Sequence, residues 1–395
     1  MSKAPKLRFK EFSGDWESKH LDKIVERVTR KNKGTISKLP LTISAQYGLV
    51  DQETFFNKTV ASKNLEGYYL LENGEFAYNK SYSNGYPWGA IKRLDRYDKG
   101  VLSSLYICFR ILDKANSDYI KQYFETSKWY KEVSMIAVEG ARNHGLLNIS
   151  VSDFFDTLHY IPSKEEQEKI AHFLSLIDDK ISLQGEKVEA LKDYKKGIMQ
   201  NIFSRELRFK DDEGRDYPEW EERKIKDIFI VTRGVVIAKT EISESKDDKN
   251  KYPVYSSQTT NNGILGYDSS YDFEGDYLTW TTDGANAGKV FRRNGKFRCT
   301  NVCGVLVEKQ ETLGFANKMI SEILNKETPK HVSYVGNPKL MNGVMGDIKI
   351  KVPILDEQIK ISKVLDNIDL KIEKEQEKLD CLNEYKKGLL QQMFV

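Results

Sequence analysis

Residues 193–203 read DYKKGIMQNIF, and residues 384–394 read EYKKGLLQQMF, nearly the same words 191 positions later. The likeness extends upstream. IPSKEEQEKIAHFLSLIDDKISLQGEKVEALKDYKKGIMQNIF (161–203) aligns without a gap to VPILDEQIKISKVLDNIDLKIEKEQEKLDCLNEYKKGLLQQMF (352–394), and 19 of the 43 positions are identical. Because a repeat of this length is one structural unit used twice, it governs the interpretation of the whole chain.

Both repeats have the pattern of a long helix. Pro162 and Pro353 stand near the start, where a missing N–H costs nothing, and Ser163 with Glu166 has capping-box spacing. Apolar residues then recur at alternating intervals of three and four, which is a heptad seam. The principal seam residues are Ile170, Leu174, Ile177, Ile181, Leu191 and Ile198 in the first copy, and Ile361, Leu365, Ile368, Ile372, Leu382 and Leu389 in the second.

Polar residues interrupt the seam at the same places in both copies, at Gln184 and Lys195 and again at Glu375 and Lys386. Such interruptions lower stability but fix register and partner choice. We therefore expect the two helices, each about 60 Å long at 1.5 Å per residue, to pack on each other as an antiparallel coiled coil. The alternative is two helices that each pack on their own domain.

Gly197 and Gly388 follow the Lys-Lys pair in both copies. A glycine inside a helix costs about 1 kcal/mol relative to alanine. The position predicts a close helix crossing or a docking notch, unless it only loosens the helix end.

A second, shorter match precedes each helix, since LRFK at 7–10 recurs at 207–210. The chain is thus a domain and a helix, repeated, and the fold class predicted is α+β with an internal pseudo-twofold. We expect domains at 1–160 and 205–351 and helices at 161–204 and 352–395. The domains diverge after their first residues. Their β-like runs are 100–112 and 301–309, and their predicted helices are 117–136 and 312–326.

Composition is that of a globular protein: 39% of residues are hydrophobic and 31% are charged, which supports a sizeable core. No run of about 18 apolar residues exists, and the N-terminus lacks an apolar segment typical of secretion. The four cysteines are scattered and complete no zinc site, so we expect reduced thiols in a cytoplasmic protein. The net charge of +3 excludes a bulk polycation but allows local basic patches.

Two basic runs contain no acid, at 27–38 and 289–298. Loops rich in amide, hydroxyl, aromatic and basic side chains accompany them, and such loops suit contact with base edges and phosphates, although turn chemistry explains them equally well. The predicted DNA contacts in the first half are Arg30, Lys31, Lys33, Ser44, Gln46, Tyr47, Asn79, Lys80, Tyr82, Asn84, Tyr86, Trp88, Lys92, Arg93, Arg142, Asn143 and His144. Those in the second half are Ser257, Gln258, Thr259, Thr260, Thr281, Thr282, Asp283, Asn286, Lys289, Arg292, Arg293, Lys296 and Arg298.

The repeat has a physical rationale if the ligand is duplex DNA, whose backbone has local dyad symmetry. A repeated scaffold that carries two different domains is suited to an asymmetric, two-part sequence. The basic residues Arg292 and Arg293 are expected to contact phosphates, so that their removal weakens affinity without changing sequence preference.

No catalytic constellation is evident. GANAGKV (284–290) lacks the spacing of a phosphate-binding loop, and Asp178-Asp179-Lys180, although spaced like a nuclease motif, lies on the heptad helix. We therefore expect a binding protein without a metal or catalytic site. Two alternatives remain. A coiled-coil scaffold for proteins or glycans would not shift mixed DNA duplexes in a gel. A fused methyltransferase or nuclease would modify or cut DNA without partners when supplied with S-adenosylmethionine or Mg²⁺.

The paired P…EQ.KI…L…ID.KI segments, each leading into YKKG..Q..F, resemble the DNA-specificity subunit of type I restriction–modification systems. The resemblance covers the whole chain. GARNHGLLNIS (140–150) also looks like the end of a target-recognition domain of that family, whereas the second half differs there, with VGNPKLMNGVMG (335–346).

The resemblance implies two target-recognition domains, each reading half of a bipartite site, and a coiled coil that binds two adenine-methylating subunits. It also implies two ATP-dependent restriction subunits. The cofactors S-adenosylmethionine, ATP and Mg²⁺ would be used by those partners, and this chain would bind none of them.

Overall fold

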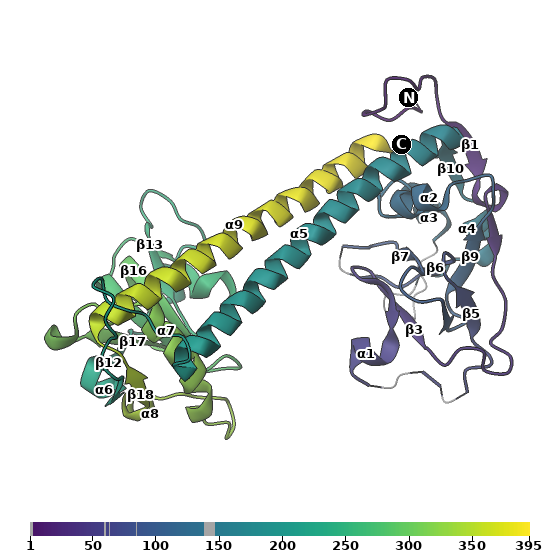
Figure 1. Cartoon of the computed structure of the whole chain (residues 1–395). Coiled ribbons are helices and arrows are strands. Elements are labelled where there is room, and N and C mark those ends of the chain that lie inside the picture. Colours follow the sequence, from purple (N-terminus) through teal and green to yellow (C-terminus); the bar gives the residue numbers. More distant parts are fainter. Residues whose placement is uncertain (1–2, 59–60, 63, 84, 138–146) are drawn as a thin grey trace. The chain divides into compact units, whose positions relative to one another are not determined.

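The computed structural model describes residues 3–58, 61–62, 64–83, 85–137 and 147–395 (Figure 1). It divides into two compact units. Unit 1 comprises Met1–Gly185 with Glu377–Val395, and unit 2 comprises Glu186–Gln376. The two long helices, α5 (Lys164–Ser204) and α9 (Leu355–Met393), therefore each contribute one part to each unit. They begin within three residues of the starts predicted for the two repeats.

Unit 1 places a four-stranded antiparallel sheet, in the order β2-β9-β6-β7, beside the short pairs β3-β4, β5-β8 and β1-β10. Its core is aromatic, with Phe76 stacked on Phe109 at 5.3 Å between ring centroids. Its elements are β1 (Glu17–His20), β2 (Val25–Arg27), β3 (Leu41–Ser44), β4 (Gly48–Asp51), α1 (Gln52–Phe56), β5 (Tyr69–Glu72), β6 (Phe76–Asn79), β7 (Ala90–Arg93), β8 (Lys99–Leu102), β9 (Ile107–Ile111), α2 (Ser117–Phe124), α3 (Tyr130–Ile136), α4 (Val151–Phe155) and β10 (Leu158–Ile161).

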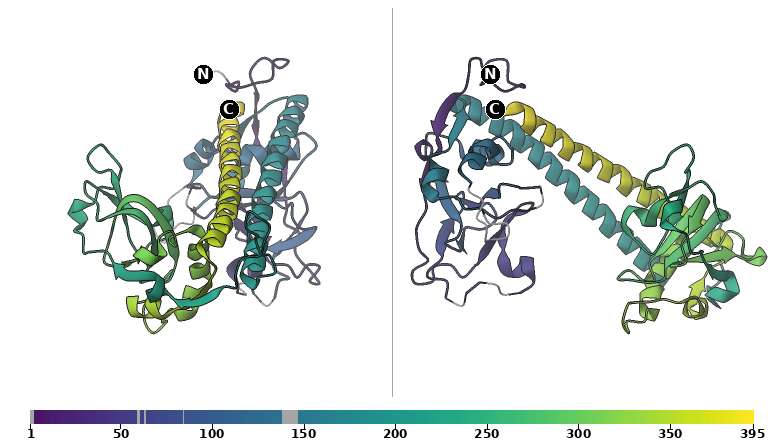
Figure 2. Two further views of the ribbon diagram at one scale, coloured as in Figure 1. Left: turned by 60° about the vertical axis from the view of Figure 1, so that its left-hand side comes forward. Right: turned by 180° about the vertical axis from the view of Figure 1, so that it is seen from behind.

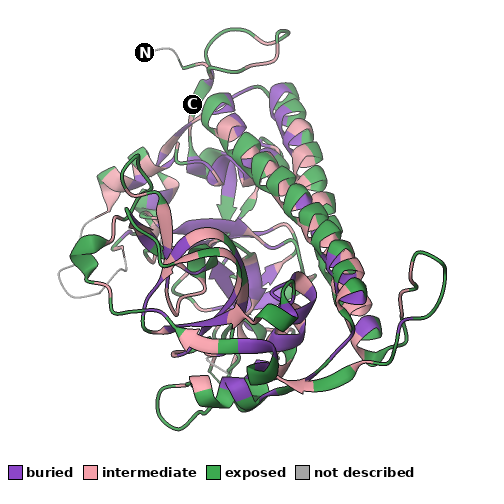
Figure 3. Ribbon diagram, turned by 90° about the vertical axis from the view of Figure 1, so that its left-hand side faces the viewer, coloured by how far each residue is buried: buried purple, intermediate pink, exposed green. Residues whose placement is uncertain are grey.

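Unit 2 has a larger six-stranded sheet in the order β12-β17-β15-β16-β13-β14, with a separate β11-β18 pair. Figure 3 shows buried positions running along its strands. Its elements are β11 (Glu221–Lys224), α6 (Ile225–Ile228), β12 (Phe229–Arg233), β13 (Tyr252–Tyr255), β14 (Ile264–Asp268), β15 (Phe273–Thr281), β16 (Val290–Cys299), β17 (Cys303–Glu308), α7 (Lys318–Glu327), α8 (Asn342–Asp347) and β18 (Lys349–Val352).

The helix predicted at 117–136 is wrong as a single element, because it is divided into α2 and α3. Thr126 interrupts it: its hydroxyl donates to the Tyr123 carbonyl at 2.6 Å and accepts from the Lys128 amide at 3.2 Å. Side-chain hydrogen bonds of this kind compete with helical ones. The helix predicted at 312–326 begins later, at Lys318, because the Asn317 side chain caps it by accepting from the Ile320 amide.

The long helices pair antiparallel within each unit. In unit 1, Ile170 and Leu174 from the start of α5 share a core with Leu389 from the end of α9. In unit 2, Ile361 and Leu365 from the start of α9 share a core with Ile202 from the end of α5. The antiparallel prediction is confirmed, and the alternative in which each helix packs only on its own domain is wrong. The side-by-side course can be followed in Figure 2.

Two of the four polar interruptions of the seam, Lys195 and Lys386, form equivalent ion pairs with the opposite helix. Lys386 Nζ lies 2.5 Å from Asp178 Oδ1 in unit 1, and Lys195 Nζ lies 2.7 Å from Asp369 Oδ1 in unit 2. Asp178 corresponds to Asp369 in the repeat and Lys195 corresponds to Lys386, so the two ion pairs are equivalent. Asp178 also accepts from Gln122 Nε2 at 2.7 Å, so its role in the coil is structural.

The repeated LRFK segment anchors the start of each helix. Arg8 forms a two-pronged ion pair with the buried Glu166, at 2.7 and 2.8 Å. Arg208 lies 3.6 Å from the equivalent Glu357, which also accepts from Trp220 Nε1 at 3.2 Å. Burial raises the pKa of Glu357 above its ordinary value. A buried carboxylate needs such partners, because an unpaired charge in the interior is costly.

The glutamine of the EQ pair joins each helix to its domain. Gln167 and Gln358 each donate to the carbonyl of the preceding proline at 2.9 Å. The side-chain oxygen of Gln167 accepts from the Asn116 amide, and that of Gln358 accepts from the Asn317 side chain. The most specific part of the repeat is thus explained by the joint between helix and domain.

Candidate nucleic-acid interface

Unit 1 contains a cleft of about 500 Å³ that gathers residues from separate predicted loops. Gln46 and Tyr47, both exposed, come from the turn between β3 and β4, and Tyr86 precedes β7. The end of α9 forms another part of the lining. Of the titratable residues that line the cleft, Lys92, Arg93, Arg96, Lys121, Lys386 and Lys387 are basic, and Asp95, Glu125 and Asp178 are acidic. This excess of cations suits a polyanion.

Two of the predicted basic residues in this cleft are neutralised inside the unit. Lys92 Nζ donates to both oxygens of Glu125 at 2.7 Å, and its side chain is only 9% exposed. Arg93 pairs with Asp95 at 2.6 Å and with Asp118 at 2.8 Å. These side chains hold the wall of the cleft in place.

Sequence reasoning missed the more accessible cations of the cleft. Arg96 is exposed three residues beyond the predicted contact Arg93, and Lys387 is exposed on α9. Lys387 belongs to the repeated YKKG, which was interpreted only as helix. The signal was present in the sequence, but the cleft that brings the helix beside the loops is tertiary.

The basic run 27–38 is less available than its sequence indicates. Arg30 pairs with Glu75 at 2.8 Å, and Lys31 donates to the Gly67 carbonyl while lying over the Tyr69 ring at 4.0 Å. Lys33 is exposed. The run contains no acid of its own, but the fold supplies one from 45 residues away.

The remaining predicted residues of unit 1 divide by exposure. Tyr82 is 60% exposed, whereas Ser44 is buried and its hydroxyl accepts from the Tyr47 amide at 3.2 Å. Lys80 donates to the Ile149 carbonyl, and Trp88 packs against the core. Asn79 Oδ1 accepts from the Ser81 amide at 3.0 Å. Asn84, Arg142, Asn143 and His144 lie outside the described residues.

In unit 2 the two predicted loop regions meet. The Ser257 hydroxyl accepts from the amides of Thr282 and Asp283, at 3.0 and 3.3 Å. Asn286 Nδ2 donates to the Thr259 hydroxyl at 3.1 Å, which ties the second loop to the first. Gln258 donates to the Ile264 carbonyl, Thr260 is exposed, and the buried Thr281 donates to the Asn286 carbonyl.

A third loop joins this surface and was not predicted. The Leu340 amide donates to the Thr282 carbonyl at 2.9 Å, and the Gly284 amide donates to the Pro338 carbonyl at 3.0 Å. Lys339 Nζ lies 3.7 Å from Asp283. Three loops thus form one polar face on unit 2.

Arg293 is an interior residue, which corrects the expectation of a surface cation. It is 3% exposed, and its guanidinium carbon lies 3.6 Å from the centroid of the Tyr255 ring. It donates to the Thr279 hydroxyl at 3.0 Å and to the Asn262 carbonyl at 2.8 Å. Burial lowers its pKa. Arg293 therefore supports the turn 260–263 from beneath, and the predicted phosphate contact is withdrawn for it.

Neighbouring arginines provide a matched test of this assignment. We expect Arg293→Gln to lower the free energy of unfolding by about 2 kcal/mol, because partners and stacking are lost in the interior. Arg292→Gln should change it by less than about 0.5 kcal/mol, since Arg292 is exposed and its ion pairs are superficial. Urea denaturation measures both. Equal effects would contradict the interior role of Arg293.

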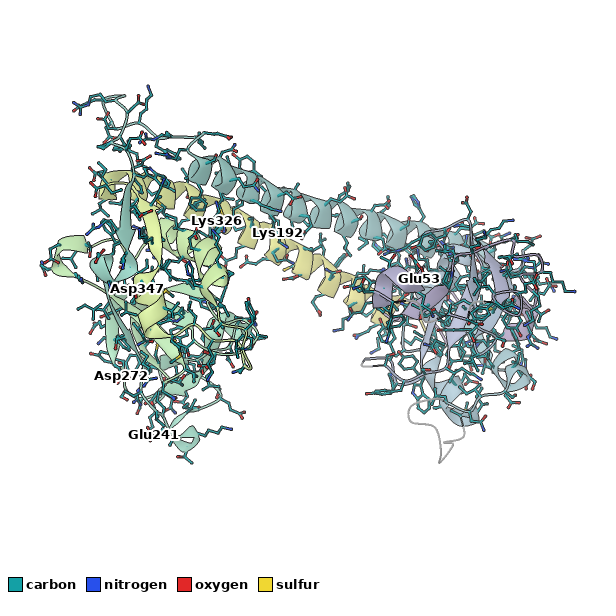
Figure 4. All side chains as sticks on the ribbon, turned by 90° about the horizontal axis from the view of Figure 1, so that it is seen from below. Glu53, Lys192, Glu241, Asp272, Lys326 and Asp347 are labelled. Carbon is teal, nitrogen blue, oxygen red and sulfur yellow. The ribbon has the colours of Figure 1, made fainter. Side chains whose placement is uncertain are left out.

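Of the other predicted cations of unit 2, Arg298 is largely buried and paired with the buried Asp268, which is a further correction to its expected role as a surface cation. Arg298 contacts Asp268 at 2.7 Å and Asp272 at 3.1 Å, with Glu241 at 3.8 Å; Figure 4 labels Asp272 and Glu241. Lys296 lies over the Tyr271 ring at 4.4 Å, and Lys289 is exposed.

The repeated helix surface remains exposed in both units. Tyr194 is 57% exposed and its counterpart Tyr385 is 53% exposed. The close crossing predicted at Gly197 and Gly388 is wrong, because a Cβ added at either would meet no atom within 4 Å. In unit 2 a groove of about 370 Å³ runs beside this surface. It is lined by Lys192, Lys195, Lys196, Met199, Gln200, Phe203 and Lys326, of which Figure 4 labels Lys192 and Lys326.

Within the described ranges, no group of three or more histidine, cysteine, aspartate and glutamate side chains could hold a metal ion. All four cysteines are free thiols, and three of them are buried. Among the residues that the structure describes, no helix is long and apolar enough to cross a membrane.

Comparison with known proteins gives a consistent result. Residues 217–384 match the family model of the type I restriction modification DNA specificity domain. Two Mycoplasma pneumoniae proteins assigned as type I specificity subunits are similar in sequence. One is 38% identical over 205 residues, which cover 52% of this chain and 72% of the relative. The other is 44% identical over 144 residues, which cover 36% of this chain and 74% of the relative.

The fold is also found among solved structures. The crystal structure of a type I restriction–modification S subunit from M. genitalium aligns with a TM-score of 0.60 over 99% of both chains, at 17% sequence identity. At that identity the match concerns the fold alone.

Proposed function

This chain belongs to the type I restriction–modification DNA specificity family, and on that premise we propose that each of its units reads one half of a bipartite, asymmetric DNA site. The reading elements are the cleft of unit 1 and the three-loop face of unit 2. In both, polar side chains on loops lie beside basic residues, as contact with base edges and phosphates requires.

One observation carries the proposal: the framework is the same in both units and the loops are not. The exchanged ion pairs Lys386–Asp178 and Lys195–Asp369 repeat, as do the arginine anchors. The turn that carries Gln46 and the turn that carries Thr259 have no such correspondence of contacts. A framework used twice with two different readers is suited to two different half-sites.

We further propose that methylation and cleavage are carried out by partner subunits, which would use S-adenosylmethionine, ATP and Mg²⁺. Two copies of the methylating subunit would dock on the repeated helix surface. Tyr194 and Tyr385 remain exposed, and Gly197 and Gly388, three residues further along each helix, are half-buried with open space where a Cβ would be. A surface presented twice suits a partner in two copies.

An exchange of loops tests the proposal. Residues 255–298 would be replaced by the corresponding residues of another family member, and residues 43–94 would be replaced in a second, reciprocal chain. Each chain would be expressed with its modification partner, and the methylated sequence would be read by methylome sequencing. We expect each exchange to change one half-site and to leave the other half and the spacer between them unchanged.

Failure has two distinguishable forms. Two unchanged half-sites in both exchanged chains would refute the assignment of reading loops. A purified wild-type complex that shows no preference among mixed duplexes in a gel shift would favour the protein scaffold instead. Methyl transfer or nicking by this chain alone would show an enzyme.

A further inference from the structure

The third loop of unit 2, residues 333–339, is held together by backbone hydrogen bonds. Ser333 and Lys339 exchange both backbone hydrogen bonds, each 2.9 Å long, and so close the loop at its base. Gly336 supplies a left-handed residue at φ +77°, which the turn requires. Below the base, Trp280 Nε1 donates to the Leu340 carbonyl at 3.0 Å, which fixes the loop to the core.

Two consecutive apolar side chains of this loop are exposed. Tyr334 is 69% exposed and Val335 is 92% exposed. A fully exposed valine forgoes about 1.5–3 kcal/mol of burial. Single exposed apolar residues are ordinary, but Tyr334 and Val335 are consecutive and together form an apolar patch; Met341, beyond the base of the loop, is also 51% exposed.

The patch adjoins groups suited to base edges. A pocket of about 190 Å³ lies at the foot of the loop, and its lining includes Asp283, Asn301 and Lys339. The Asp283 amide also donates a hydrogen bond to the Ser257 hydroxyl of the first predicted loop. The loop that carries the apolar patch is therefore joined at its foot to the face already proposed to read DNA.

The same place in unit 1 is joined in the same way. The Leu147 amide donates to the Lys80 carbonyl at 2.9 Å, just as Leu340 donates to Thr282. In each unit the acceptor follows directly on a central strand, β6 or β15, and the donor precedes the short helix α4 or α8. The hydrogen bond that joins the residue before the short helix to the end of a central strand is thus repeated in the two units.

We propose, resting on the proposed function, that loop 333–339 is a third reading element. Tyr334 and Val335 make apolar contact with base pairs of the second half-site. Thymine methyl groups in the major groove are the apolar feature that distinguishes one base pair from another, and side chains without hydrogen-bonding groups read them. The loop therefore contributes sequence preference, and the neighbouring pocket contributes polar contacts.

The test uses the whole complex with its modification partner. The variant Tyr334→Ser with Val335→Ser is compared with Ile230→Ser, a matched control that removes a 55% exposed apolar side chain from a strand of unit 2. Competition gel shifts use a duplex that carries the recognised sequence, as identified by methylome sequencing, and duplexes with base substitutions in one half-site or the other. We expect the double variant to lose about 10–100-fold in affinity for its site, as one or two lost base contacts imply.

Methylome sequencing should then show degeneracy at one or two positions of the second half-site and an unchanged first half. The conservative variant Tyr334→Phe should keep the wild-type sequence. The free energy of unfolding of the double variant should equal that of Ile230→Ser. Equal stability with unequal DNA binding separates a reading role from a folding defect.

An unchanged second half-site with unchanged affinity would overturn the inference while leaving the bipartite site of the wild type in place. Loss of the modification subunit from the purified complex, with DNA preference retained, would also overturn it and show a protein-docking loop. Only a wild-type complex without a bipartite site would refute the proposed function itself.

Discussion

Replacing Phe394 by alanine is expected to destabilise unit 1 by about 3–4 kcal/mol, whereas the same change at its repeat counterpart Phe203 should cost roughly 1 kcal/mol. Phe394 is 1% exposed, and its ring lies 5.3 Å from that of Tyr119 and 6.5 Å from that of Trp16. Phe203 is only partly buried, and Lys326 Nζ lies 5.3 Å from the centroid of its ring. Loss of a fully enclosed ring leaves a cavity, but loss of a bordering ring does not.

Hydrogen exchange followed by mass spectrometry measures the two changes separately. Faster exchange should appear in α2 for the Phe394 variant, because Tyr119 and Tyr123 in that helix pack on the ring. The Phe203 variant is the control, since it removes the same side chain from the same repeat position. Similar losses at both positions would contradict the unequal packing of the two copies.

The second large effect concerns an enclosed set of charges in unit 2. Lys195 and Lys318 each contact both Glu322 and Asp369, at distances of 2.7–3.0 Å. We expect Glu322→Gln to lower the free energy of unfolding by about 2–3 kcal/mol, because two half-buried lysines would then share one carboxylate. The side chain of Glu322 is 13% exposed, so water screens the set only in part.

The pH dependence of stability follows from the pKa shifts. Burial raises the pKa of Glu322, but the two lysines outweigh it and hold that pKa below its ordinary 4.5; Asp369 is likewise lowered from 3.8. Burial lowers the pKa of Lys318, but both carboxylates raise it above 10.5. Each ionised carboxylate thus stabilises the folded unit at a pH above its pKa in the unfolded chain. That stabilisation is lost as the pH falls through its pKa in the folded protein. Lys318 stabilises below 10.5 and loses this as pH rises.

Unit 2 should therefore be most stable between about pH 5 and 10 as far as this set is concerned. Urea denaturation of wild type and Glu322→Gln at pH 3.5 and pH 7 checks the acid side. The two proteins should differ at pH 7 and converge at low pH. The double variant Glu322→Gln with Lys318→Met should recover part of the loss. A difference that persists undiminished at pH 3.5 would assign the effect to packing rather than charge.

The sequence by itself determined the repeat, the two long helices and their antiparallel pairing. The physical reason is that heptad spacing is local, and that the matched lysines Lys195 and Lys386 reach Asp369 and Asp178 of the opposite helix only if the helices run in opposite directions. It also determined the family, through segments whose residues serve the joint between helix and domain, such as Gln167 and Gln358.

Only the tertiary structure decided which polar residues remain available. Arg293 and Lys92 look like surface cations in a sequence, but the fold places one beneath a turn and gives the other a glutamate 33 residues away. The stretch 335–346 was noted only as a departure from the family's motif, because the exposure of Tyr334 and Val335 is not a local property of the sequence. Burial and charge pairing depend on chain segments that meet in space, and for that reason the reading face became visible only in three dimensions.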